Sequence, residues 1–121
     1  TFEYSGLKVE AGREFEAGDV IKIGVTVRNT GSRAGKESVL LFINDDVASV
    51  VPDARRLRDF EKISLAPGES RRVVFEIPAE RLAFVGRDGE WHLEKGSYTV
   101  QCDRLVERLD CTADADLGVN I

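Results

Sequence analysis

The stretch 20-VIKIGVTVRNT-30, from Val20 to Thr30, decides the fold of this chain. Apolar side chains occupy every second position, and a period of two is typical of a β-strand with one buried face. The side chains predicted to face the core are Ile21, Ile23, Val25 and Val27. The sequence Asn29-Thr30-Gly31 predicts a tight turn after the strand, because Asn and Gly tolerate positive φ angles.

Segments further along the chain repeat this alternation. Ser70–Pro78 follows a predicted turn at residues 66–69, where Pro67 and Gly68 suit the second and third turn positions. Pro78 is expected to end the strand, since proline has no N–H to donate to a neighbouring strand. We also expect strands around residues 91–93, 96–102 and 109–119, the last closing the sheet, and one helical turn at residues 79–84.

The spacing of these segments predicts an all-β fold. Seven or eight short strands are separated by turn signals at intervals of roughly 8 to 12 residues, without a long amphipathic helix. This pattern is typical of an immunoglobulin-like antiparallel β-sandwich. No linker, repeat or low-complexity tract divides the sequence, so we expect one domain over residues 1–121.

Composition and charge argue against several classes of partner. The chain has 17 basic and 22 acidic residues and a net charge of −5, which disfavours nucleic acid and anionic membranes. No apolar run reaches the roughly 18 residues of a membrane-spanning helix. The sequence contains no methionine, so Thr1 is not expected to be an initiating residue. We therefore expect the chain to be a piece of a larger protein.

The residues show no evident catalytic constellation. The only histidine, His92, is expected to face solvent beside Trp91, with no nucleophile motif nearby. Trp91 and Tyr98 are predicted to be core residues. The acidic turns at residues 45–46 and 88–89 do not match a calcium-binding loop, and a calcium site assembled from separate loops stays open. We therefore expect no catalytic residue, metal ligand or cofactor in this chain.

Two cysteines, Cys102 and Cys111, are in phase with the apolar faces of the last two predicted strands. Buried thiols are one interpretation, because free cysteine is among the most buried residue types. A cross-strand disulfide is the alternative. It would require a hairpin turn centred near Val106 and Glu107, with the two cysteines brought opposite one another.

The segment Asn44–Phe60 is the best candidate for a functional surface, because such a long connection between two strands often has a role in binding. The strand before it, Ser38–Asn44, has apolar side chains on both faces, as expected either for a central strand that is covered on its outer side or for part of a patch that docks onto another domain. For the segment Asn44–Phe60, the alternative to docking is that it packs over the edge of the domain's own sheet. The candidate docking residues are Leu40, Phe42, Val47, Val50, Val51, Arg55, Arg56, Leu57 and Phe60.

The order of these motifs resembles a known family. The pieces are TFEYSGLKV at the start, GDVIKIGVTVRNTGSRAGKESVLLFI next, VASVVPDARRLRDFEKISLAPGESRRVVFEIPAERLAF after it, and DGEWHLEKGSYTV last. Together they are similar to the fibronectin type III-like domain of family 3 glycoside hydrolases, the group of β-glucosidases and β-xylosidases. The resemblance covers Phe2 to about Val100.

This resemblance implies a fibronectin type III-like β-sandwich that is itself non-catalytic. The parent protein would be a retaining β-glycosidase that removes terminal β-linked glucose or xylose, and its catalytic domains would be the partners of this domain. The resemblance also implies a periplasmic or secreted protein. Two other functions stay open: a module that binds carbohydrate or another polymer, with polysaccharide as its partner, and a cell-surface interaction domain unrelated to glycosidases.

Overall fold

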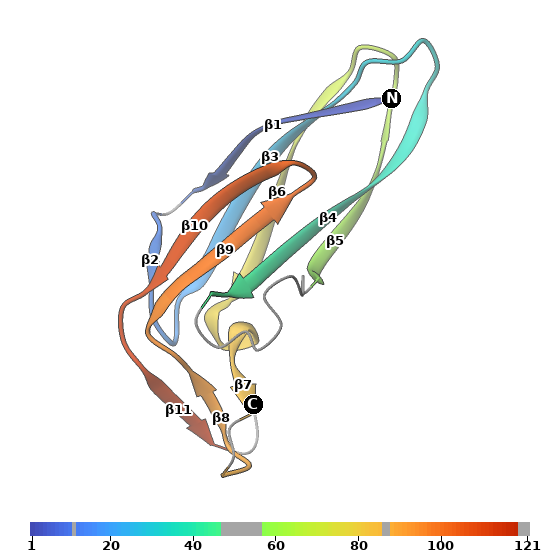
Figure 1. Ribbon diagram of the computed structural model, residues 1–121. Coiled ribbons are helices and arrows are strands. Elements are labelled where there is room, and N and C mark those ends of the chain that lie inside the picture. Colours follow the sequence, from blue (N-terminus) through green and yellow to red (C-terminus); the bar gives the residue numbers. More distant parts are fainter. Residues whose placement is uncertain (11, 47–56, 86–87, 119–121) are drawn as a thin grey trace.

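A computed structural model of the chain describes residues 1–10, 12–46, 57–85 and 88–118 (Figure 1). Eleven strands and one 3-10 helix follow each other in these parts of the chain. They are β1 Phe2–Val9, β2 Glu14–Phe15, β3 Val20–Asn29, β4 Gly35–Asp45, β5 Leu57–Leu65, β6 Ser70–Pro78, η1 Ala79–Leu82, β7 Phe84–Val85, β8 Trp91–Leu93, β9 Gly96–Cys102, β10 Leu105–Cys111 and β11 Ala115–Gly118.

Two sheets form a β-sandwich, as predicted. One has the strand order β1-β3-β6 and the other β2-β10-β9-β4-β5. All neighbours are antiparallel except the short β2, which runs parallel to β10. A third sheet, β11-β8-β7, extends from one end of the sandwich (Figure 1). The sandwich sheets thus contain eight strands in the described residues, and the third sheet was not expected from the sequence.

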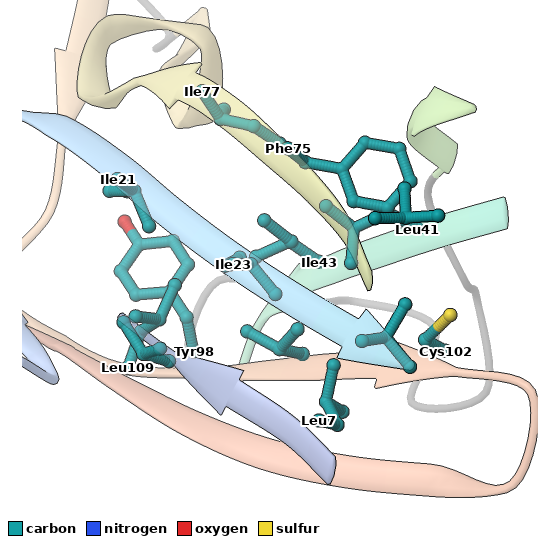
Figure 2. Packing of buried hydrophobic residues seen from close by; sticks show 14 of the residues in the cluster. Leu7, Ile21, Ile23, Leu41, Ile43, Phe75, Ile77, Tyr98, Cys102 and Leu109 are labelled. Carbon is teal, nitrogen blue, oxygen red and sulfur yellow. The ribbon is translucent and has the colours of Figure 1, made fainter. Parts of the chain in front are cut away.

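The core lies between the two sandwich sheets and consists of the predicted alternating residues. In β3 the side chains of Ile21, Ile23, Val25 and Val27 are all buried, and Val73, Phe75 and Ile77 of β6 face the same interior. Figure 2 shows side chains of β3 and β6 packed against Leu41 and Ile43 of β4 and against Tyr98 of β9. Tyr98 is fully buried, which confirms its predicted place in the core.

The two turns that border these strands form by different means. At residues 66–69, Gly68 has a φ of +78° and the Glu69 N–H donates to the carbonyl of Ala66 over 3.0 Å, as the turn prediction requires. After β3, neither Asn29 nor Gly31 has a positive φ, so the predicted reason for that turn is wrong. The buried Asn29 side chain ends the strand instead, accepting a hydrogen bond from the Gly31 N–H over 2.9 Å.

Two predicted boundaries differ in the structure. The expected last strand over residues 109–119 is two strands in different sheets, because the chain leaves β10 at Thr112, whose N–H donates to the carbonyl of Phe15. The end of the expected loop, residues 57–60, is the first part of strand β5. Paired with β4, these residues form backbone hydrogen bonds that a loop would leave to solvent.

The disulfide alternative is wrong, and the two cysteines are buried free thiols. The hairpin between β9 and β10 turns at residues 103–104, where Asp103 adopts a φ of 55°. This register places Cys102 opposite Leu105, whereas Cys111 lies opposite Gly96 at the other end. Six residues of strand separate the two positions, or about 20 Å. A disulfide requires Cα atoms within about 7 Å.

Within the described residues, the structure contains no helix with the length and hydrophobicity that crossing a membrane would require.

Candidate docking surface

Four of the predicted docking residues lie together on the outer face of the five-stranded sheet. Val39, Leu41 and Ile43 of β4 point into the core, so the alternating Leu40 and Phe42 point outward. The strand register pairs Leu40 with Phe60 and Phe42 with Leu57. Such opposite side chains are close neighbours on one sheet face. The structure therefore joins residues of the doubly apolar strand and of the predicted loop in a single apolar cluster.

This cluster is exposed. The exposed fractions are 38% for Leu40, 50% for Leu57 and 54% for Phe60, and Phe42 is partly buried between its neighbours. Single apolar side chains are common on protein surfaces, but contiguous groups often mark interaction sites. The predicted residues Val47, Val50, Val51, Arg55 and Arg56 lie outside the described residues.

A β-bulge in β5 brings Leu57 onto this face. Leu57 and Phe60 are three positions apart, so a regular strand would place them on opposite faces. The register shifts between the pairs Leu41–Asp59 and Phe42–Leu57, which leaves Arg58 as the extra residue. Both side chains consequently face outward. The sequence alternation alone did not indicate this shift.

Arg58 holds the bulge in place. Its Nε donates to the carbonyl of Ile43 over 3.2 Å, and its Nη1 donates to the carbonyl of Arg81 in η1 over 3.0 Å. Arg81 in turn donates from Nη2 to the carbonyl of Arg58 over 3.0 Å. The guanidinium group of Arg58 thus fixes the start of β5 against η1.

One cluster of ionisable side chains lies apart from this surface, on the third sheet. His92 in β8 contacts Asp116 of β11 through Nδ1 at 2.7 Å, and its Nε2 lies 3.0 and 3.1 Å from the two carboxylate oxygens of Asp88. The hydrogen bonds with Asp88 and Asp116 raise the pKa of His92, and the bond from His92 lowers the pKa of Asp88. The prediction of a simple solvent-facing histidine missed both partners.

This histidine cluster has the composition of an ion-pair network. Ligand atoms of Asp88, Glu90 and His92 lie within 4.8 Å of one another, a spacing that could hold a metal ion. However, Asp88 and Glu90 are exposed, and both imidazole nitrogens already contact carboxylates.

The neighbouring Trp91 is only partly buried, so its prediction as a core residue is wrong. The third sheet to which it belongs extends beyond the sandwich core.

Comparisons with known proteins agree with this architecture. The model of the fibronectin type III-like domain family matches residues 37–105. A protein from Formosa agariphila that is a β-xylosidase by name is 44% identical over 99 residues, which are 82% of this chain and 13% of that protein. The periplasmic β-glucosidase of Salmonella typhimurium is 35% identical over 80 residues, covering 66% of this chain and 10% of that protein.

A solved structure resembles the chain over almost its whole length. β-Glucosidase 3B from Thermotoga neapolitana, in complex with α-D-glucose, superposes with a TM-score of 0.84 at 31% sequence identity, covering 98% of this chain and 17% of that protein. The chain thus spans between 10% and 17% of the length of these three relatives, which is the size of one small domain and not of a whole glycosidase. From its fold, its sequence and these matches, the chain belongs to the family of fibronectin type III-like domains.

Proposed function

We propose that this chain is a non-catalytic accessory domain of a β-glycosidase that hydrolyses terminal β-linked glucosides or xylosides. The observation that carries the proposal is that proteins named as β-glucosidases and β-xylosidases contain a closely similar domain as a minor part of their length. Catalysis would belong to other parts of such a protein. The role of this domain would be to pack against those parts and stabilise them.

The apolar cluster on the five-stranded sheet supports a packing role. Leu40, Phe42, Leu57 and Phe60 give the sheet an outward apolar surface that the domain's own core does not use. Burial of a few hundred square ångströms of such surface contributes several kcal/mol, at roughly 25 cal/mol per Å², before ordering costs are subtracted. The other predicted docking residues, Val47, Val50, Val51, Arg55 and Arg56, lie outside the described residues, and their role in docking stays a prediction.

A periplasmic or secreted location is part of the same proposal. One relative is named as a periplasmic enzyme. The two free cysteines are compatible with either compartment, because both thiols are buried in the sandwich and separated by the length of a hairpin.

Removal of the domain from its full-length protein tests the proposal. The intact protein and a version without residues 1–121 would be compared by hydrolysis of nitrophenyl β-glucoside and β-xyloside and by thermal melting. We expect hydrolysis by the intact protein, and a lower melting temperature with reduced activity after removal. Unchanged melting and activity would argue against an accessory role, and retention of the intact protein on cellulose or xylan, lost on removal, would favour a polymer-binding module.

A further inference from the structure

We propose that the outer face of the five-stranded sheet docks onto a surface that is apolar at its centre and carries carboxylates beside the β4–β5 edge. The occupant would be another part of the same polypeptide. This inference deepens the proposed function and rests on it. It names the side of the sandwich that is covered and the chemistry of the surface that covers it.

Apolar side chains on three strands of this face lie in one row, which we call the apolar stripe and which Gln101 of β9 interrupts. The strand register aligns Val106 of β10 with Gln101 of β9, and Gln101 with Phe42 of β4, which pairs with Leu57 of β5. Val106 is 59% exposed and was not among the predicted docking residues. The register of the β9–β10 hairpin places the Val106 side chain in this row. With the Leu40–Phe60 pair alongside, apolar side chains from β4, β5 and β10 share one surface.

Two lysines border the apolar stripe at one end. The register pairs Lys62 with Ser38 and Lys36 with Ser64, in the rows that follow the Leu40–Phe60 pair. Both lysines are exposed, and within the described parts of the chain neither is in a salt bridge. A partner with carboxylates opposite them would be complementary in charge, which favours the correct alignment of two surfaces.

On the opposite face of the sandwich, the outer face of the three-stranded sheet, charged side chains form ion pairs with one another. There Arg72 of β6 binds Glu10 at 2.7 Å and donates to the carbonyl of Gly6 over 2.6 Å, so that its guanidinium group covers Gly24 of β3. Lys22 and Glu76 lie 3.9 Å apart on the same face. These charges have their partners within the domain. The outer face of the five-stranded sheet also has an ion pair, Arg108–Asp110 at 2.9 Å in β10, so what distinguishes this face is its group of neighbouring apolar side chains with Lys36 and Lys62 beside them.

The length of the relatives favours an occupant in the same polypeptide. Each of the three relatives is several times longer than this chain, which spans 10% to 17% of them. A tethered partner is present at high effective concentration, so a modest apolar contact suffices to keep it docked. A second copy of the chain would require a larger interface to associate at ordinary concentrations.

Cysteine labelling of the full-length protein tests the docking face. Phe60→Cys would place a thiol on the proposed face, and the matched control Val74→Cys would place one on the opposite face, where Val74 is 46% exposed. Because labelling of a covered site requires opening of the contact, we expect maleimide to react about tenfold more slowly at position 60 than at position 74. Equal labelling rates would overturn the proposal.

Two further measurements separate the remaining outcomes. The double variant Lys36→Glu/Lys62→Glu keeps the apolar stripe, and we expect it to lower the melting temperature of the full-length protein. An unchanged melting temperature would contradict the inference that the docked surface has carboxylates opposite Lys36 and Lys62. Protection of Phe60→Cys that disappears on dilution would identify a second copy and also overturn the proposal. If removal of the domain alters melting while labelling rates are equal, the docking face is wrong but the accessory role stands.

Discussion

Single polar residues determine how the ends of this sandwich are held together. Asn29 is the buried polar side chain among the described residues, with 1% of its surface exposed. Its Nδ2 donates to the carbonyls of Arg33 and Leu65 over 2.8 and 3.0 Å, and its Oδ1 accepts from the Gly31 N–H. One amide group therefore connects the turn after β3 with the end of β5.

Replacement of Asn29 tests this connection. In Asn29→Ala the buried carbonyl of Leu65 and the partly buried carbonyl of Arg33 lose their donor, and we expect the free energy of unfolding to fall by about 1 to 3 kcal/mol. Urea denaturation of the chain measures this change. Thr30→Ala is the matched control, since the Thr30 hydroxyl makes one exposed hydrogen bond, and a change within about 0.5 kcal/mol is expected there. Equal effects of the two substitutions would contradict the role given to Asn29.

His92 is the second residue whose surroundings lead to a prediction. Asp88 and Asp116 raise its pKa above the ordinary value of 6.5 in the folded chain. A raised pKa means that the folded state binds the proton more tightly than the unfolded state. The stabilisation is therefore fully present below about pH 6.5 and is lost as the pH rises through the raised pKa.

Nuclear magnetic resonance can measure this pKa directly, because His92 is the only histidine of the chain. We expect a midpoint above 6.5 and a lower midpoint in Asp116→Asn, in which Nδ1 loses its charged partner. His92→Gln should remove the decline in melting temperature that accompanies this titration. A midpoint at or below the ordinary value would show that the two carboxylates do not hold the proton.

At the level of whole strands, small irregularities decide which side chains meet. The bulge at Arg58 turns Leu57 onto the outer face, and the turn at residues 103–104 sets the register of the β9–β10 hairpin. A shift of one residue would exchange the inner and outer faces of a strand. The same hairpin register aligns Val106 with the apolar cluster and keeps Cys102 and Cys111 apart.

The state of the cysteines tests the hairpin register. Burial raises the pKa of Cys102 to about 11 and also raises the pKa of Cys111, so both thiols are mainly protonated at pH 8. We expect two free thiols by mass spectrometry, with slow reaction toward Ellman's reagent until denaturant unfolds the chain, because only the exposed thiolate is reactive. A mass two units lower under oxidising conditions, without loss of fold, would contradict the register.

At the scale of the whole molecule, the five-stranded sheet has one face in the core and one face on the outer surface. Leu41 and Leu40 are adjacent in β4, yet Leu41 is fully buried and Leu40 is 38% exposed. The inner face stabilises the sandwich itself. The outer face is available to a partner, so the two neighbouring leucines have separate roles.

Substitution of the two leucines distinguishes these roles. In the chain alone, Leu41→Ala should lower the free energy of unfolding by about 2 to 5 kcal/mol, because a buried cavity remains. Leu40→Ala should lower it by no more than about 1 kcal/mol, since its side chain is partly solvated. Urea denaturation provides both values. A larger loss for Leu40→Ala would mean that the outer cluster belongs to the core of this domain.

The sequence by itself determined the elements that depend on local pattern. The period of two predicted β3 and β6 with their buried faces, and proline with glycine predicted the turn between β5 and β6, because these signals act between residues that are neighbours in the chain. The order of the motifs also indicated the domain family. Leu40, Phe42, Leu57 and Phe60 are candidate docking residues from the sequence because they are apolar and have no evident place in the core.

Only the tertiary structure decided which of these distant segments meet. It placed β4 between β5 and β9, divided the last predicted strand between two sheets, and set His92 between carboxylates that are 4 and 24 residues away. Strand pairing joins residues far apart in sequence. The alternation of apolar and polar residues along one strand indicates only which of its side chains share a face. The apolar surface across β4, β5 and β10 is therefore a property of the fold, and no single segment specifies it.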